Sequence, residues 1–111
     1  MRRSKKFAVI LLVAACIAMT ADVSRAEVTA DEIQKIENAM PKKAVVEPNK
    51  PRKLLVFNLC QGFEHSCIPY WDKALEIMSD KTGAFSVEFS NDLNIFKAES
   101  LKQFDAVCFN N

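Results

Sequence analysis

The chain has 111 residues, of which 50% are hydrophobic and 26% charged, and its formal net charge is +1. Its first 26 residues hold five of the 15 basic side chains and one of the 14 acidic ones, so residues 27–111 have a net charge of −3. Nucleic-acid-binding domains normally carry a clustered basic face. This charge balance therefore excludes nucleic acid as an expected partner.

Residues 1–26 are predicted to be an export signal. Four basic residues among the first six precede the apolar run Phe7–Met19, which is shorter than the roughly 20 apolar residues that span a bilayer. Ser24-Arg25-Ala26 has the small-x-small pattern of a cleavage site after Ala26. We therefore expect an exported protein, periplasmic or secreted from a bacterial cell.

A second processing site within this signal stays open. Val13-Ala14-Ala15-Cys16 has the form of a lipoprotein box, which would attach a lipid to Cys16. The next three residues are apolar where a lipid tether is usually polar, so cleavage after Ala26 is favoured. Contact with a membrane is thus expected only through the export signal or through a lipid anchor at Cys16.

Residues 27–52 are predicted to form a short helix followed by a linker. Thr29 and Glu32 fit a capping box, in which a hydroxyl and a carboxylate satisfy free backbone N–H groups at a helix start. The helix is expected over residues 30–40 and ends at Pro41. From there to residue 52 the chain is rich in proline and lysine, a composition that favours extended, unpaired backbone.

The remainder, residues 53–111, alternates between strands and helices. Residues 53–60 form a nearly continuous apolar run, which is typical of a strand covered on both faces. Ser66 is predicted to cap the helix that follows, with Pro69 in its first turn and Gly83 at its end.

Two more strands are predicted, at residues 84–90 and 104–109, with a short helix over residues 98–103 between them. Crossovers of this length give parallel pairing with right-handed connections. We therefore expect an α/β fold with a parallel sheet, incomplete with three strands and covering helices. The last strand is apolar like a central strand rather than charged like an edge, so we expect the protein to continue past Asn111.

Tryptophan and cysteine side chains have competing interpretations here. Trp71 lies at helical spacing from Leu75, so packing in the core is favoured over a platform on which a sugar ring stacks. Residues 27–111 contain three cysteines, an odd number for an exported protein, so at least one thiol stays unpaired within this chain. Cys60 and Cys108 are interpreted as buried strand residues that act as small apolar side chains.

Four motifs stand in order along residues 50–111: the RKLLVF strand, the GF-x-H-S-x-IP loop from Gly62 to Pro69, the KTGAF turn and the FDAVCFNN strand. In this combination the segment resembles the amino-terminal part of a ThuA-like (trehalose utilisation) domain. The resemblance implies a flavodoxin-like fold, with a parallel sheet of order 2-1-3, related to class I glutamine amidotransferases. It also implies a role in the utilisation of trehalose or a related sugar. Relatives tend to open the second helix with Thr-Pro-Glu, where this chain has Lys97-Ala98-Glu99.

A sugar-binding site is predicted at one edge of the sheet. In flavodoxin-like sheets, ligands bind beyond the carboxyl ends of the first and third strands. The expected sugar-binding residues there are Gln61, Gly62, Phe63, Ser66, Asn110 and Asn111, with His65 as the candidate catalytic residue. Gly62 would permit a tight turn, and the His65 imidazole can donate, accept or bind metal. The competing interpretation is a hydrogen-bonded surface histidine, with asparagines that simply turn the chain.

Metal binding is a further possibility for this loop. Cys60, His65 and Cys67 offer three zinc ligands, although their spacing matches no standard zinc module. A divalent metal held by His65 together with residues of a longer protein is the alternative, and the cofactor is otherwise unknown. Glu64 beside His65 is an acid/base pair in one interpretation and a solvated carboxylate in the other.

Two functions from different classes remain compatible with the sequence. One is a sugar-binding protein that processes its ligand, for example as a metal-assisted hydrolase, and the other is a noncatalytic binding module of the cell envelope with the proline-rich arm as a spacer. The sequence contains no Gly-rich phosphate loop, no Ser/His/Asp order and no nucleophile elbow at a cysteine. It therefore does not decide whether the protein is an enzyme.

Overall fold

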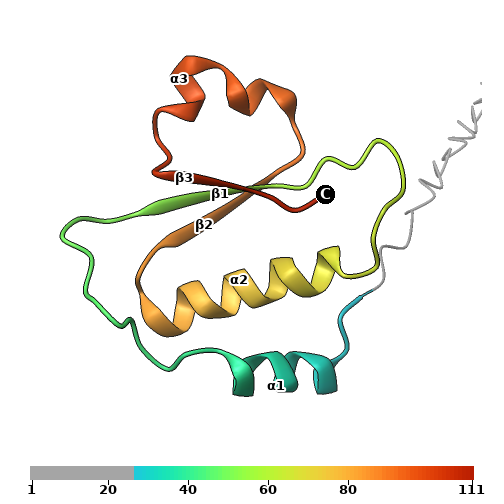
Figure 1. The fold of residues 1–111 in the computed structure, drawn as a ribbon, viewed down its shortest axis with the longest axis vertical. Helices are drawn as coiled ribbons and strands as arrows, with labels where there is room; N and C mark the ends of the chain where they lie inside the picture. Colours follow the sequence, from blue (N-terminus) through green and yellow to red (C-terminus); the bar gives the residue numbers. More distant parts are fainter. Residues whose placement is uncertain (1–26) are drawn as a thin grey trace, which may run out of the picture.

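A computed structural model describes residues 27–111, so the predicted export signal and the lipid-anchor site at Cys16 lie outside the described residues. Helices and strands follow one another along the chain as Figure 1 shows. They are α1 (Ala30–Ala39), β1 (Lys53–Phe57), α2 (Ile68–Thr82), β2 (Ser86–Ser90), the 3-10 helix η1 (Leu93–Phe96), α3 (Ala98–Leu101) and β3 (Ala106–Phe109).

The three strands form one parallel sheet of order β2-β1-β3. β1 is central, and its Leu54 lies opposite Val87 of β2 and Ala106 of β3. Helical segments make both crossovers, since α2 leads from β1 to β2, and η1 with α3 leads from β2 to β3. The predicted α/β class and the predicted strand order are therefore confirmed.

Helices cover both faces of this sheet, with α2 on one face and η1 with α3 on the other (Figure 1). β1 is buried from both sides: Leu55 and Val56 are 0% exposed and Phe57 is 4% exposed. The Phe57 ring meets Phe96 of η1 edge to face, with 4.7 Å between the ring centroids. Because β1 is covered on both faces, its residues form a continuous apolar run rather than an alternation of apolar and polar side chains.

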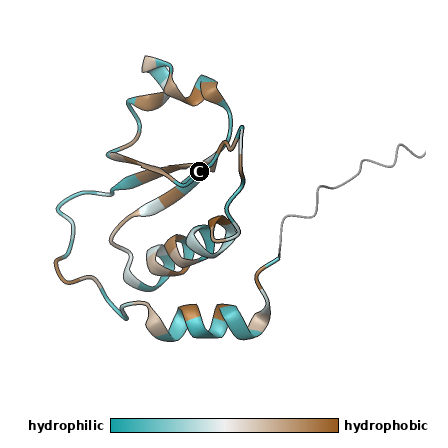
Figure 2. Ribbon diagram, turned by 45° about the vertical axis from the view of Figure 1, so that its right-hand side comes forward, coloured by the Kyte–Doolittle hydropathy of each residue, from teal (hydrophilic) through white to brown (hydrophobic). Residues whose placement is uncertain are grey.

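α1 forms a third layer against the side of α2 that faces away from the sheet (Figures 1 and 2). The predicted capping box is confirmed, because Thr29 accepts from the Glu32 backbone N–H and the Glu32 carboxylate accepts from the Thr29 N–H. Polar contacts hold α1 on α2: Tyr70 Oη donates to Glu32 Oε1 at 2.8 Å, and Lys81 Nζ donates to the Glu37 carbonyl at 2.6 Å. No residue of α1 is buried.

The start of α2 differs from the prediction, because Ser66 does not cap it. Cys67 occupies the N-cap position with φ −79° and ψ −14°, and its side chain makes no capping hydrogen bond. A side-chain cap needs an extended backbone at that position, whereas this chain is already turning: the Ile68 N–H donates to the His65 carbonyl at 3.2 Å. Pro69 in the first turn and Gly83 at the C-cap agree with the prediction.

The prediction that Trp71 packs in the core is wrong, because this residue is 57% exposed. α2 turns Ile68, Ala74 and Ile77 into the core instead. Trp71 lies on the flank of α2 beside β3, and within the part of the chain that the structure describes no strand pairs with the outer edge of β3. The described residues therefore leave the indole ring largely uncovered.

The cysteines are free thiols, at Cys60, Cys67 and Cys108. β1 ends at Phe57, so Cys60 lies in the following loop, where its Sγ donates to the Phe63 carbonyl at 3.1 Å. Its interpretation as a buried strand residue is therefore wrong. Cys108 does lie in a strand, β3, where it is half-buried.

The 3-10 helix η1 was not expected from the sequence. Asp92 begins it, because its carboxylate accepts from the Asn94 backbone N–H at 2.9 Å. No helix within residues 27–111 combines the length and the apolar composition that crossing a membrane requires.

Candidate functional site at the carboxyl rim

Residues 58–67, after β1, and residues 110–111, after β3, leave the sheet at the same edge, because β1 and β3 are adjacent and parallel. We call these two segments the carboxyl rim. They are in direct contact: the Asn110 N–H donates to the Phe57 carbonyl at 2.9 Å, and Asn111 Nδ2 donates to the Leu59 carbonyl at 3.3 Å. The structure thus brings together the two segments that the predicted strand order placed side by side.

The loop part of the rim is open to solvent. Every loop residue predicted to meet a ligand is exposed, namely Gln61, Gly62, Phe63, His65 and Ser66. The Phe63 ring packs edge to face on the imidazole of His65, with 5.0 Å between the ring centroids. The His65 carbonyl accepts from the Ile68 N–H, so the backbone of His65 is fixed while its imidazole stays accessible.

Gly62 has no conformational need to be glycine, contrary to the predicted tight turn. Among the described residues only Gly83 has a positive φ. A Cβ added at Gly62 would also meet no atom within 4 Å. The backbone and the space at Gly62 therefore accept a Cβ, as in alanine.

The strand-end asparagines and His65 do not hydrogen-bond to each other within residues 27–111. Asn110 turns its side chain toward α2, where Nδ2 donates to the Ile68 carbonyl at 3.1 Å and to Asp72 Oδ1 at 2.8 Å. Asn111 is exposed and reaches only the loop backbone. The rim therefore has two polar parts, an exposed imidazole in the loop and an oriented amide beside α2.

Asp72 is the residue that sequence analysis missed. Its Oδ2 accepts from Asn58 Nδ2 at 2.9 Å, while its Oδ1 accepts from Asn110 Nδ2 at 2.8 Å. One carboxylate on α2 thus joins the ends of β1 and β3. The positions of these residues in the sequence could have indicated the cluster. Asn58 and Asn110 each directly follow an apolar strand, and Asp72 lies one turn into the next helix, four residues after Ile68.

A hollow of about 260 Å³ lies beside the Asp72 cluster, on the α2 side of β3. It is lined by Trp71, Leu75, Cys108, Phe109 and Asn110. Its two aromatic residues are largely exposed, Trp71 at 57% and Phe109 at 63%. The Phe109 ring stacks on Phe96 of η1, on the other face of the sheet, so the hollow combines one exposed indole with one oriented amide.

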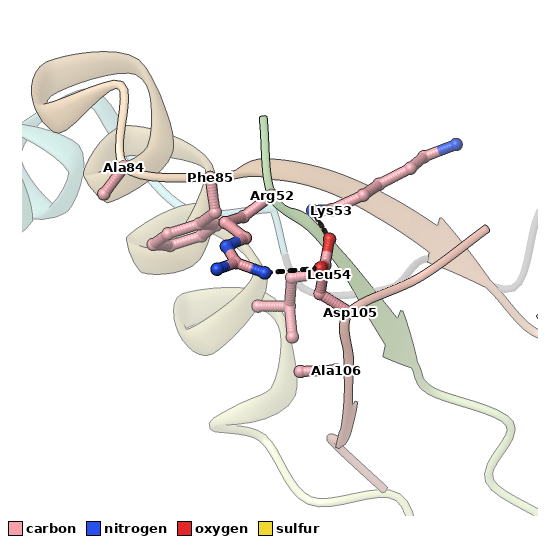
Figure 3. A pocket seen from close by; sticks show the side chains of 7 residues that line it. All are labelled: Arg52, Lys53, Leu54, Ala84, Phe85, Asp105 and Ala106. Atoms are coloured by element: carbon pink, nitrogen blue, oxygen red, sulfur yellow. Dashed lines mark hydrogen bonds and ion pairs between the residues drawn. The ribbon is translucent and has the colours of Figure 1, made fainter. Parts of the chain in front are cut away.

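At the opposite edge of the sheet, a second hollow of about 370 Å³ contains a charged cluster that Figure 3 shows. Asp105 accepts from Arg52 Nη1 and from the Lys53 backbone N–H, each at 2.9 Å, and Lys50 Nζ lies 3.4 Å from it. The Lys53 backbone hydrogen bond, followed by that of Arg52, lowers the pKa of Asp105 from its ordinary 3.8 to about 2. This cluster joins the starts of β1 and β3, far from the rim in the fold.

Cys60, His65 and Cys67, the three potential zinc ligands of the loop, are not placed as a metal site. Within residues 27–111 no group of three or more histidine, cysteine and acidic side chains is placed to hold a metal ion. The thiol of Cys60 is directed to the Phe63 carbonyl.

Comparison of the chain with known protein families, with curated proteins and with solved structures gives no match. The function must therefore be argued from the rim itself and from the motifs in the sequence.

Proposed function

We propose that this chain is an exported ThuA-like protein of carbohydrate utilisation that binds trehalose or a related sugar at the carboxyl rim. The observation that carries the proposal is the adjacency of β1 and β3, which puts the His65 loop and the two asparagines at one edge. Ligands of open parallel sheets bind at such edges. The sugar class follows from the resemblance of residues 50–111 to ThuA-like domains.

Neutral polar groups of the rim suit a sugar, whose hydroxyls both donate and accept hydrogen bonds. Gln61, Ser66 and Asn111 offer such groups on exposed side chains. The exposed imidazole of His65 adds one donor and one acceptor in its neutral form. His65 is therefore the proposed polar centre of the loop and the first candidate for proton transfer.

A divalent metal does not fit the described residues as they stand, because they contain no group of three potential ligands. The proposal therefore assigns to His65 hydrogen bonding and proton transfer only.

The direct test is titration of the chain with trehalose, followed by backbone amide NMR and by calorimetry, for the wild type and His65→Ala. We expect shifts at residues 61–66 and 111, and a Kd that rises about tenfold in His65→Ala, as for the loss of one or two hydrogen bonds. Gln34→Ala is the matched control, because Gln34 is an exposed polar residue of α1 away from the rim. Wild-type affinity in His65→Ala would remove His65 from the site.

A second candidate function is a noncatalytic module of the cell envelope. It is favoured by residues 41–52, which contain no helix or strand and leave Val45 at 99% and Val46 at 78% exposed, as a spacer would. Incubation with trehalose separates the two candidates. Binding without any product supports the module, whereas glucose release or another product that depends on His65 supports an enzyme.

A further inference from the structure

The Asp72 cluster fixes the direction of two amide groups. An ionised carboxylate only accepts hydrogen bonds, so Asn58 and Asn110 must turn their NH₂ groups toward Asp72 and their Oδ1 atoms away from it. In Asn110 the amide nitrogen also donates to the Ile68 carbonyl, which uses both of its N–H groups. Asn110 therefore offers a ligand one group only, the acceptor Oδ1.

Asn110 lines the hollow beside Trp71. Both residues line the same space of about 260 Å³, which has room for a single sugar ring. A pyranose ring carries an apolar C–H face that packs on aromatic rings, and hydroxyl donors around its edge. Trp71, which is 57% exposed, supplies the aromatic surface, and Asn110 supplies the acceptor.

The charge around this hollow favours a neutral sugar over a phosphorylated one. No basic side chain lines it, and the Asp72 carboxylate stands directly behind Asn110 at 2.8 Å. A phosphorylated sugar would bring a second negative charge to this place without a cation to balance it. A neutral sugar meets no such repulsion.

We propose that the hollow lined by Trp71 and Asn110 is a subsite for one ring of a neutral, unphosphorylated sugar, and that Asp72 is its positioning residue. This inference rests on the proposed function and extends it: it places a sugar ring beside β3, in addition to the contacts of the His65 loop. Trp71 packs on the ring, Asn110 Oδ1 accepts from a ring hydroxyl, and Asp72 holds Asn110 in that orientation.

Trp71 is the only tryptophan of the chain, so intrinsic fluorescence reports on the subsite directly. The chain is titrated with trehalose, with per-O-methylated trehalose, which has no hydroxyl donor, and with trehalose 6-phosphate. We expect trehalose to change the Trp71 emission. The methylated sugar should bind about tenfold more weakly because it has no hydroxyl donor for Asn110, and the phosphate about tenfold more weakly because its charge is close to that of Asp72. Equal affinity for all three compounds would overturn the subsite.

Asp72→Asn and Asp80→Asn form a matched pair for the positioning role. Both remove one negative charge from α2, but Asp80 is exposed and takes no part in the cluster. In the wild type the Kd for trehalose 6-phosphate should be about ten times the Kd for trehalose. We expect Asp72→Asn to lower this ratio to less than about threefold, and Asp80→Asn to leave it near tenfold. Thermal unfolding of both variants accompanies the titrations. A change in stability with an unchanged preference would reduce Asp72 to a structural role.

The side-chain amide signals of Asn58 and Asn110 in ¹H–¹⁵N spectra test the cluster without any sugar. In the wild type we expect slow exchange of these protons with water, and faster exchange in Asp72→Ala. Fast exchange in the wild type would overturn the proposed orientation. The same spectra are recorded with trehalose present. Chemical-shift changes in the His65 loop without any change at Trp71 and Asn110 would overturn the subsite alone. No chemical-shift change at any residue would overturn the proposed function as well.

Discussion

Asp105 and Arg52 join the start of β3 to the residue before β1 through a hydrogen-bonded ion pair, with 2.9 Å between Arg52 Nη1 and Asp105 Oδ1 (Figure 3). The same carboxylate accepts from the Lys53 N–H and thereby binds the first residue of β1. The two strands whose far ends form the rim are therefore also fixed at their near ends.

Asp105 should make stability depend on acid pH. Its pKa is about 2 in the folded chain, against an ordinary 3.8, so the unfolded chain takes up the proton first as the pH falls. The stabilisation is complete above about pH 5 and is lost toward pH 2. Urea unfolding at pH 7 should find Asp105→Asn less stable than the wild type, and at pH 2 most of this difference should be gone. Asp80→Asn serves as the control, and a deficit for Asp105→Asn that is equal at both pH values would contradict the prediction.

Tyr70 should ionise at an unusually high pH. The hydrogen bond from its hydroxyl to Glu32, together with burial and the negative charge of Glu32, raises the pKa of Tyr70 above 10.0. Since Tyr70 is the only tyrosine, phenolate absorbance measures it without interference. Glu32→Ala should lower this pKa. Thr29→Ala, which breaks the capping box but keeps the Glu32 carboxylate, should leave it raised unless α1 detaches from α2.

The two glycines of the chain should respond differently to alanine. Gly83 ends α2 at φ +62°, a conformation that costs a residue with a Cβ about 1 kcal/mol. Gly62 has no positive φ and has free space around it. Gly83→Ala should therefore lower the free energy of unfolding by about 1 kcal/mol, whereas Gly62→Ala should change it by less than about 0.5 kcal/mol. Denaturant titration measures both, and equal losses would refute the assignment.

Leucine-to-alanine substitutions should reveal the extent of the core. Leu55 is 0% exposed, in the centre of the sheet, and Leu93 in η1 is 60% exposed. Leu55→Ala should cost about 3 kcal/mol, from lost burial and from the cavity it leaves. Leu93→Ala should cost less than about 1 kcal/mol. If Leu55→Ala unfolds the chain outright, Leu55→Val gives a smaller loss that still exceeds that of Leu93→Ala.

Sequence patterns predicted the buried central strand and the helix ends because these features depend on local chemistry, whereas the strand order was expected from the resemblance to a flavodoxin-like fold. The apolar run at residues 53–60 indicated a strand buried on both faces, and Leu55 and Val56 are fully buried. Thr29 and Gly83 mark helix ends through backbone hydrogen bonds and φ, which neighbouring residues determine. Such features need no knowledge of the rest of the fold.

Tertiary context decided the features that were missed. Trp71 has the spacing of a core residue, but its burial depends on which neighbours the fold places beside it, and helical periodicity alone does not specify them. Ser66 is a good cap by residue type, yet the turn that begins at His65 removes the extended backbone it needs. The Asp72 cluster joins residues 58, 72 and 110, and only the three-dimensional structure brings them together.

The hydrogen bond between Asp72 and Asn110 also implies an order of folding steps. The two residues are 38 positions apart, and contacts of long sequence separation form late because they close long loops. In a chain that has assembled only β1, α2 and β2, the hydrogen bond between Asn110 and Asp72 cannot yet form, because Asn110 follows β3. The subsite therefore forms only when β3 docks. A chain that stops folding before this step would keep most of its helical content but would not bind the sugar.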